Sequence, residues 1–191
     1  MRFRELDGMR EDPRLPQMPR LEPRQLWFVE QMPATTLSAL DRAAVITANV
    51  VIYDRALAGV VADALPLGAY AEPSSANVQA SGPAISPRAL QFVADGWSVV
   101  RLVEAGPRWR ERMQQAPREL FPISAGDHAL PVRLIARTSA ERYTELGTCL
   151  YGLSELIDNC DDDSLLTVIF GPIATRNTAQ SYPFTANGLA G

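Results

Sequence analysis

Short apolar runs rich in β-branched residues alternate with helical patterns along the first part of the chain, and this alternation limits the possible folds most strongly. The strand-like runs lie at residues 26–29, 49–53, 67–71 and 97–103. Apolar residues at helical spacing occupy 37–48, 57–64 and 86–95, and Thr35 or Thr36 and Ser86 are expected to cap two of these helices. Because such an alternation pairs strands in parallel through right-handed crossovers, residues 25–117 are expected to form a mainly parallel α/β sheet flanked by helices.

The pattern changes after Pro117. Residues 131–135 and 165–170 are typical of strands, and Thr148 is expected to cap a helix between them. Residues 118–178 are therefore expected to form a second, smaller α/β lobe. Residues 1–24 carry six arginines, five acids and four prolines with little apolar periodicity, which indicates a disordered arm. Residues 179–191 are expected to form a frayed tail.

The composition narrows the chemistry. All 18 basic residues are arginine, which excludes Schiff-base and general-base catalysis by lysine. The single histidine, His128, has no evident companions for a catalytic triad. Cys149 and Cys160 lie eleven residues apart without further metal-ligand candidates nearby. We expect them to be reduced, buried thiols, and we expect no metal site.

Charge and hydropathy bear on partners. The net charge of -4 argues against a nucleic-acid partner, because phosphate neutralisation needs a basic surface. The spacing of Arg108, Arg110 and Arg112 spreads them around a helix that is expected to be solvated. No apolar run approaches the roughly 20 residues that span a bilayer, and the first residues resemble neither a signal nor a transit peptide. We expect a cytoplasmic protein without a membrane partner.

Five segments in order carry a resemblance to a known family. They are residues 26–33 (LWFVEQMP), 48–57 (ANVVIYDRAL), 96–102 (GWSVVRL), 146–150 (LGTCL) and 167–172 (TVIFGP). Together they resemble the tetrapyrrole methylases, which use S-adenosylmethionine and include uroporphyrinogen-III C-methyltransferase. The match covers about residues 26–173, and it implies a tetrapyrrole-methylase-like fold with a truncated second lobe.

The resemblance also implies site residues. It assigns the cofactor loops to Pro33, Gly106 and Gly147, and the proton acceptor to Asp54. The loops depart from the family, since its glycine-rich first loop is EQMPATT here, its second loop is EAGP, and its lysine after the second helix is missing. Side chains such as Glu, Gln and Met do not replace glycine cheaply where backbone must approach a ligand. We therefore expect S-adenosylmethionine to be the cofactor by family resemblance only, and not to be bound.

Asp54 has two interpretations. By the resemblance it is a general base, but it also follows a strand and precedes a helix, where an aspartate caps the helix. Arg55 and Arg101 could contact the carboxylates of a tetrapyrrole, or they could form surface ion pairs.

Three functions remain open. The first is a methylase-like protein without methyl transfer that serves as a binding or regulatory partner. The second is an active S-adenosylmethionine-dependent methyltransferase acting on a tetrapyrrole through a divergent loop. The third is a carrier of a tetrapyrrole or another small molecule without turnover.

A homodimer or another protein partner is expected as well. The shortened lobe lacks strands that the family possesses, and the apolar surface they covered would need to be buried. The residues expected near it are Leu134, Leu153, Leu165 and Phe170, with the acidic turn at 161–163 as its rim. The alternative is that the remaining strands close up and leave no such surface.

Overall fold

The computed structural model describes residues 19–74, 84–121, 130–139 and 142–173. Most of the expected N-terminal arm, His128 and the C-terminal tail lie outside these ranges. Nothing in the structure therefore bears on the predictions made for them.

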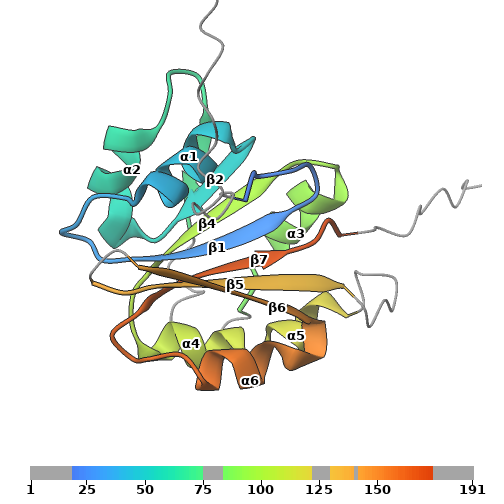
Figure 1. Ribbon diagram of the computed structural model, residues 1–191. Coiled ribbons are helices and arrows are strands. Elements are labelled where there is room, and N and C mark those ends of the chain that lie inside the picture. Colours follow the sequence, from blue (N-terminus) through green and yellow to red (C-terminus); the bar gives the residue numbers. More distant parts are fainter. Residues whose placement is uncertain (1–18, 75–83, 122–129, 140–141, 174–191) are drawn as a thin grey trace, which may run out of the picture.

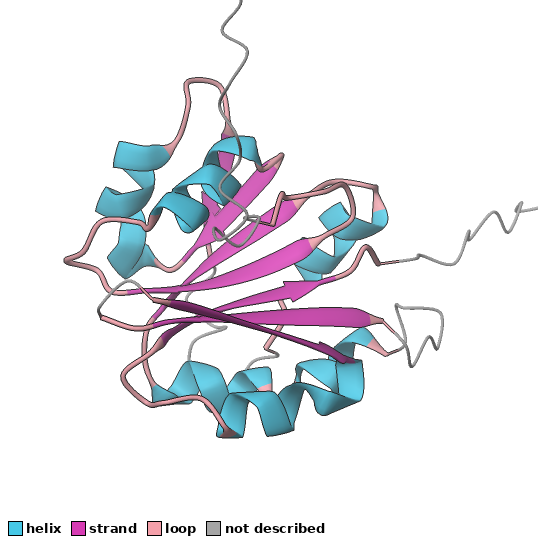
Figure 2. Cartoon of the chain, viewed as in Figure 1, coloured by secondary structure: helices cyan, strands magenta, loops and turns pink. Residues whose placement is uncertain are grey.

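Seven strands form one mixed sheet in the order β3-β2-β4-β1-β7-β5-β6 (Figures 1 and 2). They are β1 (Leu26–Gln31), β2 (Val50–Tyr53), β3 (Tyr70–Pro73), β4 (Val99–Glu104), β5 (Pro131–Arg137), β6 (Tyr143–Cys149) and β7 (Leu165–Phe170). Strands β1 to β4 pair in parallel, as predicted, whereas β5, β6 and β7 pair in antiparallel fashion. The strands expected in a second lobe thus extend the first sheet, because β7 pairs with β1 along its edge.

Helices cover both faces of this sheet (Figure 1). The helices are α1 (Ala39–Thr47), α2 (Ala58–Ala64), α3 (Pro87–Ala94), α4 (Pro107–Met113), α5 (Ala116–Leu120) and α6 (Leu153–Asp158), with 3-10 turns η1 (Arg55–Leu57) and η3 (Leu150–Gly152). Helices α1 and α2 pack with Trp27 and Val29 on one face, while α3 to α6 pack with Leu26 and Phe28 on the other. Strand β1 is therefore buried on both faces, which explains its uninterrupted apolar run. None of the described helices combines the length and the apolar character needed to cross a membrane.

Two expected caps are wrong and one is confirmed. Ser38, and neither Thr35 nor Thr36, caps α1 by accepting a hydrogen bond from the Asp41 N–H. Thr148 lies in β6 opposite Val132, so it caps no helix. Ser86 caps α3 as predicted, through the N–H of Ala89.

Three of the four apolar residues expected at a partner interface are inside the molecule, whereas Leu165 is half-buried and lines a pocket. Leu134, Leu153 and Phe170 are fully buried in the core between the sheet and helices α3 to α6. They are buried because β5 and β7 close onto the first sheet, which was the alternative left open. The acidic turn at 161–163 is exposed, as expected. Cys149 is also exposed and Cys160 is half-buried, so the expectation of two buried thiols is wrong for Cys149.

Candidate functional site

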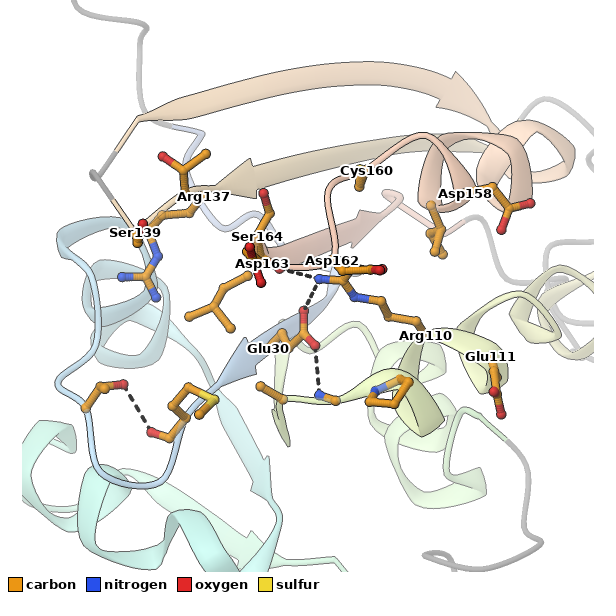
Figure 3. Close-up of a pocket in the computed structure, with 18 of the residues that line it drawn as sticks. Glu30, Arg110, Glu111, Arg137, Ser139, Asp158, Cys160, Asp162, Asp163 and Ser164 are labelled. Carbon is orange, nitrogen blue, oxygen red and sulfur yellow. Dashed lines mark hydrogen bonds and ion pairs between the residues drawn. The ribbon is translucent and has the colours of Figure 1, made fainter.

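A pocket of about 970 Å³ opens at the carboxyl ends of β1 and β4 (Figure 3). Strand β1 leads to α1 on one face of the sheet, whereas the neighbouring β4 leads to α4 on the opposite face. Connections that diverge in this way leave a crevice at the strand ends, where open α/β sheets bind ligands. The volume lies within the range of about 300–1,000 Å³ that is typical of small-molecule sites.

Besides Glu30, Gln114 and the region at the end of α6 (Ile157, Asp158, Cys160), four segments of the described residues line this pocket. They are the loop after β1 (Met32, Thr35, Thr36), the start of α4 (Ala105 to Glu111 in part), the end of β5 (Arg137, Thr138, Ser139) and the approach to β7 (Asp162 to Leu165). The pocket therefore lies where the parallel half of the sheet meets the antiparallel half.

Glu30, near the end of β1, joins these halves. One carboxylate oxygen accepts the Gly106 N–H at 3.0 Å, and the other accepts the Leu166 N–H at 3.0 Å and lies 3.5 Å from Arg110. The side chain is only 2% exposed. Burial raises the pKa of Glu30 above its usual value, although the two backbone hydrogen bonds and Arg110 oppose this effect. Both oxygens are thus committed to holding the strands and α4 together.

Arg110 is a structural residue of the same junction. Its guanidinium donates to the carbonyl oxygens of Asp161 and Ser164 and lies 3.8 Å from the Asp162 carboxylate. The expectation of a solvated helix is therefore wrong for this arginine, whose side chain is 12% exposed. Its partners lie more than 50 residues away in sequence, so local spacing carried no signal for them.

Gln31 organises the loop after β1 in place of glycine residues. Its buried amide Nε2 lies 2.6 Å from the Thr35 hydroxyl, 2.9 Å from the Thr35 carbonyl and 3.1 Å from the Met32 carbonyl. No residue of this loop adopts a positive φ angle. A side-chain amide therefore shapes the loop, which does not form the glycine cradle of the methylases.

In the second loop, Gly106 keeps a positive φ of 155°, but its backbone donor is in use. Gly106 lines the pocket, but its N–H is already bonded to Glu30. Pro33 is exposed outside the pocket lining, and Gly147 lies on β6 opposite Arg133. The structure brings only one of the three expected cofactor residues to the pocket, and the cofactor roles of all three stay predictions.

Asp54 lies outside the pocket lining, in a buried ion pair with Arg101 on β4. Its carboxylate also accepts the Ser74 hydroxyl at 3.0 Å and the Glu104 N–H at 2.9 Å. Burial by itself would raise the pKa of Asp54, but the charge of Arg101 and these hydrogen bonds bring it below its usual value. A lowered pKa and three donors make this carboxylate a poor proton acceptor.

The helix-cap interpretation of Asp54 is also wrong. Its side chain makes no cap hydrogen bond to η1, and only its backbone carbonyl accepts the Leu57 N–H, at 2.8 Å. Arg101 is 7% exposed, and its guanidinium is held by the Asp54 carboxylate and the Leu102 carbonyl. It therefore forms a buried ion pair, whereas a surface ion pair or a ligand contact was expected. Arg55 is exposed. The catalytic role of Asp54 stays a prediction.

Another buried carboxylate, Asp41 of α1, lies beside Arg137, which lines the pocket. It accepts the hydroxyl groups of Ser38 at 2.6 Å and Thr167 at 3.0 Å, and Nη2 of Arg137 lies 3.7 Å away. Burial raises the pKa of Asp41, against the opposing effects of Ser38, Arg137 and Thr167. Asp41 thus ties α1 to β7. Within the described ranges, no three His, Cys, Asp or Glu side chains are grouped to hold a metal ion.

Comparisons with known proteins give structural neighbours only. No protein-family model matches the chain, and no curated protein matches it. One similar solved structure is a cobalamin biosynthetic enzyme, cobalt precorrin-4 methyltransferase, at 10% identity and a TM-score of 0.34, over 78% of this chain and 95% of that one. Another is uroporphyrin-III-C-methyltransferase from Thermus thermophilus, at 16% identity and a TM-score of 0.37, over 78% of this chain and 92% of that one. Both of these neighbours are methyltransferases.

Proposed function

We propose that this protein is a methylase-like binding protein that holds a small molecule in the pocket at the ends of β1 and β4 without transferring a methyl group. The observation that carries this proposal is the placement of Glu30. Its carboxylate takes the Gly106 N–H and contacts Arg110, so polar groups at the pocket wall already serve the fold. The pocket remains, whereas the N–H groups of Ala105 and Gly106 in the second loop are in use.

The position of Asp54 supports the same proposal. A general base must lie within hydrogen-bond reach of the substrate proton. Asp54 is held by Arg101, Ser74 and the Glu104 N–H, away from the pocket lining. By the family resemblance, a tetrapyrrole is one candidate ligand, and a protein of this kind could serve as a regulatory partner of a true methylase.

A direct test is to map ligand binding on the isotope-labelled protein by nuclear magnetic resonance with a library of small fragments. We expect saturable shifts to cluster at the residues that line the pocket. Thr36 is exposed and lines the pocket, so Thr36→Trp should block binding by filling space. Ala34 is exposed in the same loop outside the lining, so Ala34→Trp is the matched control. Fragments that bind elsewhere, or equally well to both variants, would contradict the proposal.

The second candidate, an active S-adenosylmethionine-dependent methyltransferase, is favoured by one observation. Gly106, which the resemblance assigns to a cofactor loop, lines a pocket at the strand ends where a nucleotide-like ligand would bind. Titration with the cofactor separates the two candidates, because the binding-protein proposal expects no tight complex.

A further inference from the structure

Arg137, at the end of β5, is a charged side chain without a hydrogen-bond partner among the residues that the structure describes. Its Nη2 atom is buried and makes no hydrogen bond to the described residues, although it lies 3.7 Å from the Asp41 carboxylate, and the side chain is 13% exposed where it lines the pocket. A guanidinium carries five N–H donors, and leaving such donors unpaired away from water is costly. This arrangement calls for an acceptor that the described part of the chain does not supply.

Asp41 does not fill this role. The distance of 3.7 Å between its carboxylate and Nη2 of Arg137 is too long for a hydrogen bond, although the opposite charges attract. The carboxylate of Asp41 is instead occupied by the hydroxyl groups of Ser38 and Thr167. Asp41 therefore holds Arg137 at the pocket wall and leaves its donors available.

The neighbours of Arg137 offer further donors to the same region. The hydroxyl oxygen of Thr138 is buried without a hydrogen-bond partner, and Ser139 also lines the pocket. Figure 3 shows Arg137 and Ser139 together on one side of the pocket, while Asp158 and Arg110 lie on the other side. The second arginine of the pocket, Arg110, is by contrast engaged by Glu30 and by two backbone carbonyls.

We propose that Arg137, Thr138 and Ser139 bind a carboxylate or phosphate group of the ligand. A planar guanidinium matches two oxygens of such a group at once, and the hydroxyl groups can donate to the remaining lone pairs. The acidic side chains Asp158, Asp162 and Asp163 also line the pocket and would repel further negative charge. The ligand therefore places one carboxylate or phosphate group at this end of the pocket, and this inference rests on the proposed binding function.

Two small probes test the inference on the full-length, isotope-labelled protein: propionate as the carboxylate and methyl phosphate as the phosphate. We expect at least one of them to shift the Arg137 side-chain N–H and the Thr138 amide signals saturably, with a dissociation constant on the order of millimolar. Arg137→Gln should weaken this binding by about tenfold or more, since charged hydrogen bonds are lost. The probe that saturates first shows which anionic group the site prefers.

Arg133 provides the matched control. It lies on the same strand and the same sheet face as Arg137, but it pairs with Glu145 at 3.6 Å and does not line the pocket. Arg133→Gln should leave probe binding unchanged. Arg137→Lys keeps a positive charge beside Asp41, so this variant should fold even if Arg137→Gln does not. Because lysine lacks the planar fork of the guanidinium, Arg137→Lys should still bind the probes more weakly than the native protein.

The outcomes separate this inference from the proposed function. The anion site is wrong, and the binding function stands, if fragments bind the pocket but neither probe shifts the Arg137 side-chain signals. The same conclusion follows if Arg137→Lys and Arg137→Gln bind the probes as well as the native protein does. If neither fragments nor probes bind, the proposed function is wrong and this inference is overturned with it.

Discussion

Replacing Glu30 by glutamine tests the junction between the two halves of the sheet. Glu30→Gln preserves volume, but an amide has one acceptor oxygen where the carboxylate has two. One of the two N–H donors, from Gly106 or Leu166, would then face an NH₂ group. Arg110 would also lose its buried charged partner.

The expected loss is about 3 kcal/mol in the free energy of unfolding, at the low end of the roughly 3–5 kcal/mol for breaking a buried ion pair. The low end applies because Arg110 keeps the carbonyls of Asp161 and Ser164. The burial that raises the pKa of Glu30 also shows that its charge is costly to desolvate, and the neutral variant is relieved of that cost.

Equilibrium urea unfolding at pH 7, followed by tryptophan fluorescence and circular dichroism, measures this loss. The matched control is Glu111→Gln, because Glu111 lines the same pocket but is exposed. It should change stability by no more than about 0.5 kcal/mol. A loss below about 1 kcal/mol for Glu30→Gln, or equal losses for both variants, would refute the reasoning.

Three further predictions follow from the other contacts. Asp54→Asn should cost about 3 kcal/mol at pH 7, because Arg101 stays buried without its partner, whereas a lost helix cap would cost about 1 kcal/mol. The pKa of Asp54 is lowered on folding, so its contribution to the free energy of unfolding is complete above the ordinary value of 3.8 and is lost as pH falls through the lowered value. The urea midpoints of the native protein and Asp54→Asn should therefore converge in acid. If the two midpoints stay equally far apart at every pH, the ion pair is not the cause. Gln31→Ala should cost about 1–2 kcal/mol and speed hydrogen exchange at Thr35, and unchanged exchange would show that the amide does not hold the loop. We also propose a homodimer that pairs through the outer edge of β6, because this seven-residue strand has no proline to prevent pairing with another chain. Light scattering should give a mass of twice 20.9 kDa, and the mass of one chain, unchanged on dilution, would contradict the proposal.

The parallel half of the fold was predictable because three of its strands, β1, β2 and β4, are buried on both faces. Such strands are nearly continuous apolar runs, as in β1 and β4, and the helix cap at Ser86 is a local signal. Strand β6 was missed because it lies at the sheet edge, where exposed polar residues and Gly147 mask the pattern of a strand. Thr148, which lies within this strand, was therefore expected to cap a helix.

The site was less predictable because its contacts are long-range. Glu30 meets Leu166 across 136 residues, and Asp54 meets Arg101 across 47. A signal for the second pair existed, since the parallel register of β2 with β4 places Ile52 opposite Arg101. For Glu30 and Arg137, the chain gave no local pattern, because their roles depend on β7 and β5 joining the first sheet.

The central claim is that the pocket binds a ligand but does not cradle a methyl donor. Isothermal titration calorimetry with S-adenosylmethionine and S-adenosylhomocysteine tests it most directly, with Thr36→Trp as the variant whose pocket is filled. The account predicts that neither compound binds the native protein more tightly than about 1 mM, which corresponds to about 4 kcal/mol. A micromolar dissociation constant that Thr36→Trp abolishes and Ala34→Trp preserves would contradict the account and establish the pocket as a cofactor site.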